Sequence, residues 1–264
     1  MQPDRFELIP AFYLAVPFLF LLILINYLGH RFKVYYIRKF PGTEDIGIGS
    51  MEGSLLGLTA LLLSFSFGMS ASKFETRRQH IISETNNIGT AVLRCDMYPD
   101  SIRNLLRSDF KNYLETRLAY YDASDNEELI KQTLEQADSI SNIIWRRVAL
   151  LSHDLNNRVA SEQMVPALNA TIDIVTTREA GRKATIPRII LIVLCILIFV
   201  SAFLSGYGSK NRERNKILVV AFAIVTTLGF YLVVDLDKPR QGFVNLNSAE
   251  QLMENLRTLF PDNH

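Results

Sequence analysis

Apolar residues are concentrated in four segments of the chain, and the stretches between them are rich in charge. None of the four segments contains Asp, Glu, Lys or Arg; they span residues 11–29, 53–71, 189–206 and 217–234. Each is close to the roughly 20 residues that an α-helix needs to cross the hydrocarbon core of a bilayer. The pattern predicts a multi-pass membrane protein with four transmembrane helices, which we expect in a plasma membrane.

A long polar stretch with helical periodicity separates the second and third segments. From Phe74 to Cys95, side chains of one face recur at steps of three and four, and further stripes begin near Ile102, Glu127 and Asn157. Little in the sequence indicates strands. We therefore expect an all-α protein with this organisation: a first transmembrane hairpin (1–71), an extramembrane helical domain (72–186), a second transmembrane hairpin (187–235) and a C-terminal tail with a short helix (236–264).

The first apolar segment has a competing interpretation as a cleaved signal peptide. The preceding sequence, "MQPDRFELIP", has no basic region, and the apolar run is longer than a signal peptide requires. No small-residue cleavage site comes before the basic stretch that starts at Arg31. These flanks favour a true transmembrane helix.

Composition and charge indicate no catalytic or nucleic-acid chemistry. The formal net charge is +1, so the basic excess of a nucleic-acid binder is lacking. The four histidines show no metal-ligand spacing, and the two cysteines lie in different environments, Cys95 in the polar stretch and Cys195 in the third segment. We expect no enzyme activity, no metal, no cofactor, no disulfide and no nucleic-acid partner.

The second apolar segment carries a continuous stripe of small residues. On a helix these residues follow one another at steps of three and four; they are Gly57, Ala60, Ser64, Gly68 and Ser72. Small stripes allow membrane helices to approach closely, because packing and weak hydrogen bonds replace the hydrophobic driving force in lipid. The stripe is a predicted helix-packing surface.

Bulky apolar side chains form a second stripe beside the small one. Its members are Leu58, Leu61, Leu62, Phe65 and Met69, and Ser66 lies near its margin. An ordinary helix buried in a bundle accounts for this pattern as well as a pore helix does. In a pore helix, rings of bulky side chains from several subunits form a hydrophobic constriction that gates by dewetting.

The stretch that begins with this stripe resembles the bacterial family called bestrophin-like. It reads "LTALLLSFSFGMSASKFETRRQHIISETNNIGTAVLR", residues 58–94. As in that family, an apolar span runs into an Arg–Arg pair, here Arg77 and Arg78. An acidic-Asn-Ile-Gly-Thr stretch follows, here Glu84, Asn87, Ile88, Gly89 and Thr90. The order of two spans, a helical insert and two spans also matches.

A more distant resemblance links this layout to the bestrophin channels. It implies a homo-oligomeric ion channel in the bilayer, with five subunits. The second transmembrane helix of each subunit then lines a pore for permeant ions. The neck then falls at Leu58, Leu62 and Phe65 or Ser66, and Met69 completes the predicted pore-lining set. The dense acidic cluster of the calcium-activated channels is missing, since only Asp235 and Asp237 come directly after the fourth segment, before Lys238. No calcium site is therefore expected.

Two questions stay open in the sequence. A membrane sensor or scaffold that signals through its helical domain to a partner protein is the alternative to a channel. The side of the membrane is the other question: Lys and Arg in the short loops favour an external helical domain, whereas the resemblance implies a cytosolic one. We favour the cytosolic side.

Overall fold

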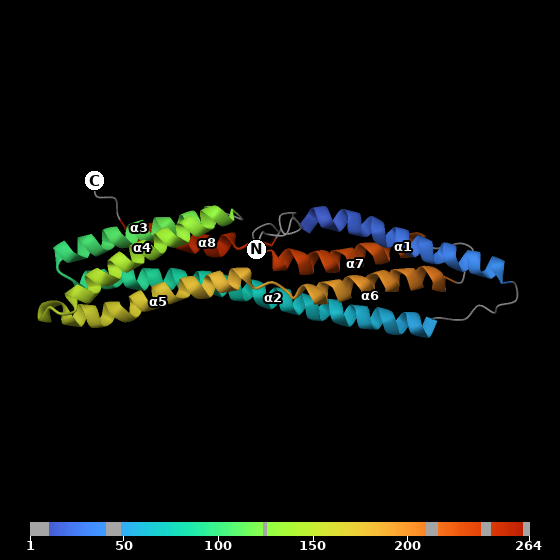
Figure 1. Ribbon diagram of the computed structural model, residues 1–264, viewed down its shortest axis with the longest axis horizontal. Coiled ribbons are helices and arrows are strands. Elements are labelled where there is room, and N and C mark those ends of the chain that lie inside the picture. The colour runs from blue at the N-terminus through green and yellow to red at the C-terminus, as the bar shows by residue number, and fades with distance from the viewer. Residues whose placement is uncertain (1–10, 41–48, 124–125, 210–215, 239–243, 261–264) are drawn as a thin grey trace. The chain divides into compact units, whose positions relative to one another are not determined.

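The protein is helical throughout the part of the chain that is described. The computed structural model describes residues 11–40, 49–123, 126–209, 216–238 and 244–260, and these contain no strand. The elements in chain order are α1 (Ala11–Lys39), α2 (Gly49–Arg94), η2 (Cys95–Met97), α3 (Asp100–Asp122), α4 (Glu127–Leu151), η3 (Leu155–Asn157), α5 (Arg158–Lys183), α6 (Arg188–Gly208), α7 (Lys216–Asp237), α8 (Asn247–Glu254) and η4 (Asn255–Leu259) (Figure 1). The predicted all-α class is confirmed.

The chain divides into two compact units. Unit 1 comprises Met1–Phe74 and Thr185–Val244, and unit 2 comprises Glu75–Ala184 and Asn245–His264. Four helical stretches of the described chain are long and apolar enough to cross a membrane. Their charge-free segments all belong to unit 1. Helix α2 contributes its apolar half to unit 1 and its polar half to unit 2.

The core of unit 1 is built where α1 lies against α6 and α7. Phe18 of α1 stacks on Phe230 of α7, with 4.4 Å between ring centroids, and Leu22 is 1% exposed between the helices. The buried cluster consists of Phe18, Leu22, Leu194, Ile198, Ala202 and Ala223. Two separate hairpins of sequence neighbours were expected. The structure does not confirm that pairing, because this core joins α1 to the third and fourth spans.

Two glycines bring the backbones of α1 and α6 into direct contact. A Cβ atom added to Gly206 would lie 2.0 Å from the Asn26 carbonyl oxygen, and one added to Gly29 would lie 2.1 Å from that of Phe203. The Asn26 side chain donates to the Ala202 carbonyl oxygen at 3.0 Å beside this crossing. Small residues therefore hold the subunit together here, at positions that the sequence analysis did not select.

Helix α2 is held in unit 1 by small polar side chains. The hydroxyls of Thr59 and Ser201 lie 2.8 Å apart, and Ser70 donates to the Val233 carbonyl oxygen at 2.8 Å. Thr59 and Ser70 are both buried, and so is Ser66 of the same helix. This polar face of α2 therefore points into its own subunit.

Unit 2 has a separate hydrophobic core. It is formed by the polar half of α2 with α3, α4 and α5, and its fully buried members include Ile88, Leu106, Phe110, Ile144 and Met164. The C-terminal helices belong to this core, because Met253 and Phe260 are buried in it. Arg107 secures the tail by donating to the Leu259 carbonyl oxygen at 2.7 Å.

We predict that Gly206→Ala destabilises the subunit. The new methyl group would overlap the α1 backbone, and overpacking of this kind costs about 1–3 kcal/mol. Thermal unfolding of purified protein in detergent measures the effect. Gly53→Ala is the matched control, since nothing lies within 4 Å of a Cβ atom there. Equal melting temperatures for both variants would contradict the α1–α6 crossing.

Candidate functional sites

The small stripe of α2 is exposed on the surface of the subunit. Gly57, Ala60, Ser64, Gly68 and Ser72 are all exposed. A Cβ atom added to Gly57 or Gly68 would meet nothing within 4 Å. These glycines therefore differ from Gly29 and Gly206, which make their close contacts within the subunit.

The predicted pore-lining residues divide between the two faces of α2. Leu58, Phe65 and Met69 are exposed, with 49%, 62% and 36% of their surface accessible. Leu62 is only half-buried, whereas Ser66 is fully buried and donates to the Leu62 carbonyl oxygen at 2.8 Å. The structure therefore brings the first three together on the outer face and places Ser66 inside the subunit.

The outer face of α2 combines the two stripes side by side. Leu61, which is 53% exposed, continues the bulky stripe between Leu58 and Phe65. A shallow hollow runs along this face and is lined by Ser64, Phe65, Gly68, Met69, Ser72 and Lys73. A surface with large and small apolar side chains in adjacent rows is suited to packing against another helix.

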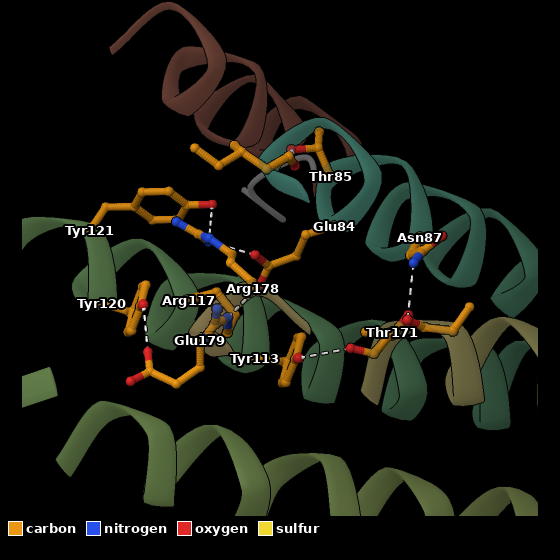
Figure 2. Close-up of polar contacts among 12 residues, drawn as sticks. Glu84, Thr85, Asn87, Tyr113, Arg117, Tyr120, Tyr121, Thr171, Arg178 and Glu179 are labelled. Atoms are coloured by element: carbon orange, nitrogen blue, oxygen red, sulfur yellow. Dashed lines mark hydrogen bonds and ion pairs between the residues drawn. The ribbon is translucent and has the colours of Figure 1, made fainter. Parts of the chain in front are cut away.

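Unit 2 contains a buried ion cluster (Figure 2). Glu84 of α2 is fully buried and accepts from two guanidinium groups: Arg117 Nε lies 2.5 Å from Oε1, and Arg178 Nη1 lies 2.5 Å from Oε2. Arg178 also donates to the Tyr121 hydroxyl. The cluster joins three helices, since Arg117 belongs to α3 and Arg178 to α5.

Aromatic rings pack against both guanidinium groups. The Tyr120 ring centroid lies 4.5 Å from the guanidinium carbon of Arg117 and 5.0 Å from that of Arg178. The Tyr121 ring lies 3.9 Å from Arg178. The negative face of an aromatic ring attracts a cation, so these contacts help to stabilise the buried arginines.

Opposing effects set the pKa of Glu84. Burial favours the neutral acid, but the charges of Arg117 and Arg178 and their hydrogen bonds prevail and lower the pKa of the carboxyl group. Burial raises the pKa values of Tyr113 and Tyr121, so both phenols are neutral at physiological pH. Glu84 is therefore a buried carboxylate that two buried cations keep ionised.

A second ion-pair group extends the cluster toward the surface. The Tyr120 hydroxyl donates to Glu179 Oε2 at 3.0 Å, and Arg182 contacts Glu179 at 2.8 Å and Glu127 at 2.7 Å. Burial acts to raise the pKa of Glu179, but hydrogen bonds from Arg182 and Lys183 lower it to about 2. Glu179 is thus already neutralised by its own basic neighbours.

The second half of the signature stretch, residues 75–94, belongs to this unit. Asn87 donates to the Ala170 carbonyl oxygen at 2.9 Å, Ile88 is fully buried, and a Cβ atom on Gly89 would lie 3.3 Å from Leu256. Arg77 donates to the carbonyl oxygens of Gly181 and Ala184 at 3.1 and 2.6 Å. The stretch therefore serves to pack α2 against α5 and η4.

The sequence analysis placed Glu84 in the signature stretch but did not find its partners. Arg117 and Arg178 lie 33 and 94 residues further along the chain. An arginine on the apolar stripe of a helix would have been the signal for each. In the described part of the chain, no group of three potential metal ligands comes together, and both cysteines are free.

The fold and the exposed face of α2 define an all-helical membrane protein with four candidate spans and a separate helical unit. Residues 53–250 match the model of the bestrophin-like domain. The protein belongs to the bestrophin-like family. No curated protein matches the sequence.

Solved structures of a bacterial bestrophin homologue from Klebsiella pneumoniae share this fold. The structure phased with zinc is 14% identical, with a TM-score of 0.71 over 92% of this chain and 97% of that chain. Two single-substitution variants of it each cover 94% of this chain. One has a TM-score of 0.72 at 12% identity over 99% of its own chain, and the other has a TM-score of 0.73 at 15% identity over 97% of its own chain. At such identities the similarity establishes the fold alone.

We predict that Glu84→Gln strongly destabilises unit 2. The substitution leaves two buried guanidinium groups without a counter-charge, and breaking a buried ion pair typically costs about 3–5 kcal/mol. Chemical unfolding of the purified protein tests this, and the exposure of Trp145, which packs against the core of unit 2, reports the unfolding. Glu115→Gln is the control, because Glu115 forms an exposed pair with Arg257 and such pairs contribute at most about 1 kcal/mol. Similar losses for the two variants would contradict the proposed importance of the cluster.

Proposed function

We propose that the protein is a homo-oligomeric ion channel whose pore is lined by α2. The observation that carries this proposal is the exposed outer face of α2 in a helix whose polar face is already buried in its own subunit. Copies of α2 that pack side by side around an axis would cover this face. Membership of the bestrophin-like family and the shared fold with bestrophin homologues support the same assignment.

The two stripes of the outer face would have different roles in this ring. The small stripe, Gly57 to Ser72, packs against a neighbouring copy, since each glycine leaves open space for a neighbour's side chains. The bulky stripe narrows the pore with Leu58, Leu61, Phe65 and Met69, to which the half-buried Leu62 adds at the margin. Ser66 is omitted from the proposed neck because its hydroxyl is buried within the subunit.

The resemblance to bestrophin channels supports the remaining parts of the assignment. A pentamer in the bacterial inner membrane, with unit 2 in the cytosol, is the arrangement that we propose. The outer face carries no charged side chain between Leu58 and Ser72. A pore lined by this face would therefore discriminate weakly between ions, because fixed charges are a main source of selectivity.

We predict that Gly57→Leu and Gly68→Leu disrupt assembly without unfolding the subunit. Each new side chain meets open space within the subunit but would hold neighbouring α2 helices apart in a ring. Native mass measurement in nanodiscs should give a pentamer for the parent and smaller species for the variants. The melting temperature serves as the control for folding. A monomeric parent, or variants that assemble like the parent, would argue against the interface.

We predict that Phe65→Ala raises ion flux. A hydrophobic constriction conducts poorly because it dewets, and removing the bulky ring widens and rewets it. Currents from purified protein in planar bilayers measure the change. Phe67→Ala is the matched control, because Phe67 is also exposed but lies two positions along, on the opposite flank of the outer face. Intact oligomers that give silent bilayers for parent and variant would favour the sensor or scaffold function instead.

A further inference from the structure

The ion cluster of unit 2 contains one carboxylate and two guanidinium groups. Glu84, Arg117 and Arg178 are 0%, 1% and 7% exposed. The two carboxylate oxygens are divided between the arginines, one for each. The three buried side chains together carry a formal charge of +1.

The other acidic groups near the cluster balance this charge poorly. Tyr113 and Tyr121 are neutral, so neither supplies a negative charge. The Tyr120 hydroxyl connects the cluster to Glu179 by a hydrogen bond, but the negative charge of Glu179 is paired with Arg182 and Lys183. Glu250 of α8 acts on Tyr121, and Asp138 of α4 acts on Tyr113. Glu250 is only half-buried and Asp138 is exposed, so solvent screens both charges.

One hydrogen-bond donor of the cluster has no acceptor, and its position indicates where a counter-ion would bind. Arg117 Nη1 is buried, and it has no hydrogen-bond partner among the described residues. A buried donor without an acceptor is costly, and a buried charge without a counter-ion is costlier still. In native proteins such groups are generally satisfied by a bound water or ion.

We propose that unit 2 binds a small monovalent anion of halide size at Nη1 of Arg117. A halide accepts the unused hydrogen bond and cancels the excess charge at once, whereas a water molecule would do only the first. Phosphate and sulfate fit less well, because a dianion would exceed the +1 charge of the cluster and would have to lose a strongly held hydration shell to reach Arg117, which is 1% exposed. This inference does not depend on the proposed channel function.

Chloride binding to the full-length protein in detergent tests the proposal. Thermal unfolding is compared in potassium chloride and in potassium gluconate at equal ionic strength, because gluconate is too large for the site. A ligand at tenfold its dissociation constant should raise the melting temperature by about 3–5 °C in a protein of this size. Radioactive chloride binding at equilibrium measures the site directly. Equal melting temperatures with no bound chloride would overturn the proposal and leave water as the partner of Nη1.

Two substitutions locate the site. Arg117→Gln removes the donor and Arg178→Gln removes the excess charge, so each should abolish the chloride-dependent shift. Each leaves Glu84 with one arginine, so the remaining pair is balanced. Arg257→Gln, on the exposed surface, should keep the full shift. Chloride dependence that persists in Arg117→Gln would place the bound anion elsewhere, in a pore for example, and would refute the site.

A structure determined in iodide provides a test that needs no variant. The heavy halide should appear within hydrogen-bonding distance of Arg117 Nη1, and its anomalous signal distinguishes it from water. This outcome would support the site even if the arginine variants fail to fold. A water molecule, or an empty position, at Nη1 in saturating iodide would refute it.

Discussion

A helix inside a bilayer gains little from burying apolar side chains against other helices, because the surrounding lipid is equally apolar. The contacts that fix α2 in unit 1 are therefore close approaches and hydrogen bonds, such as those of Thr59 with Ser201 and of Ser70 with Val233. These contacts use one side of the helix. The opposite side, with its small and bulky stripes, is left for other molecules, and the proposed pore and subunit interface both depend on this division.

Unit 2 is organised by a different constraint, the high cost of burying charge. Glu84 of α2 pairs with one arginine from α3 and one from α5. These pairs form only when the three helices are in one particular arrangement. Hydrophobic packing around Ile88 and Phe110 tolerates small shifts, but a buried carboxylate does not. The same arrangement leaves one positive charge and one hydrogen-bond donor unmatched, which is the basis of the proposed anion site.

Much of the helical architecture was predictable because it depends on local periodicity. The four apolar segments, the continuation of α2 past Lys73 and the start of α4 at Glu127 all follow from residue spacing. The stripes of α2 were also visible, but Ser66 illustrates the limit: its place on a helical wheel does not reveal which arc meets α6 and α7. Arg117, Arg178 and the crossing at Gly29 and Gly206 were missed, because their roles depend on contacts between distant parts of the chain.

The division of α2 into an inner and an outer face is the central claim, and cross-linking tests it most directly. In a protein whose Cys95 and Cys195 have been replaced, Ser64→Cys introduces a thiol on the outer face and Ser66→Cys one on the inner face, only two residues away. A short bifunctional thiol reagent is applied to the protein in membranes. The account predicts covalent dimers and larger species from Ser64→Cys and monomers from Ser66→Cys. Cross-linked subunits from Ser66→Cys, or only monomers from both, would contradict it.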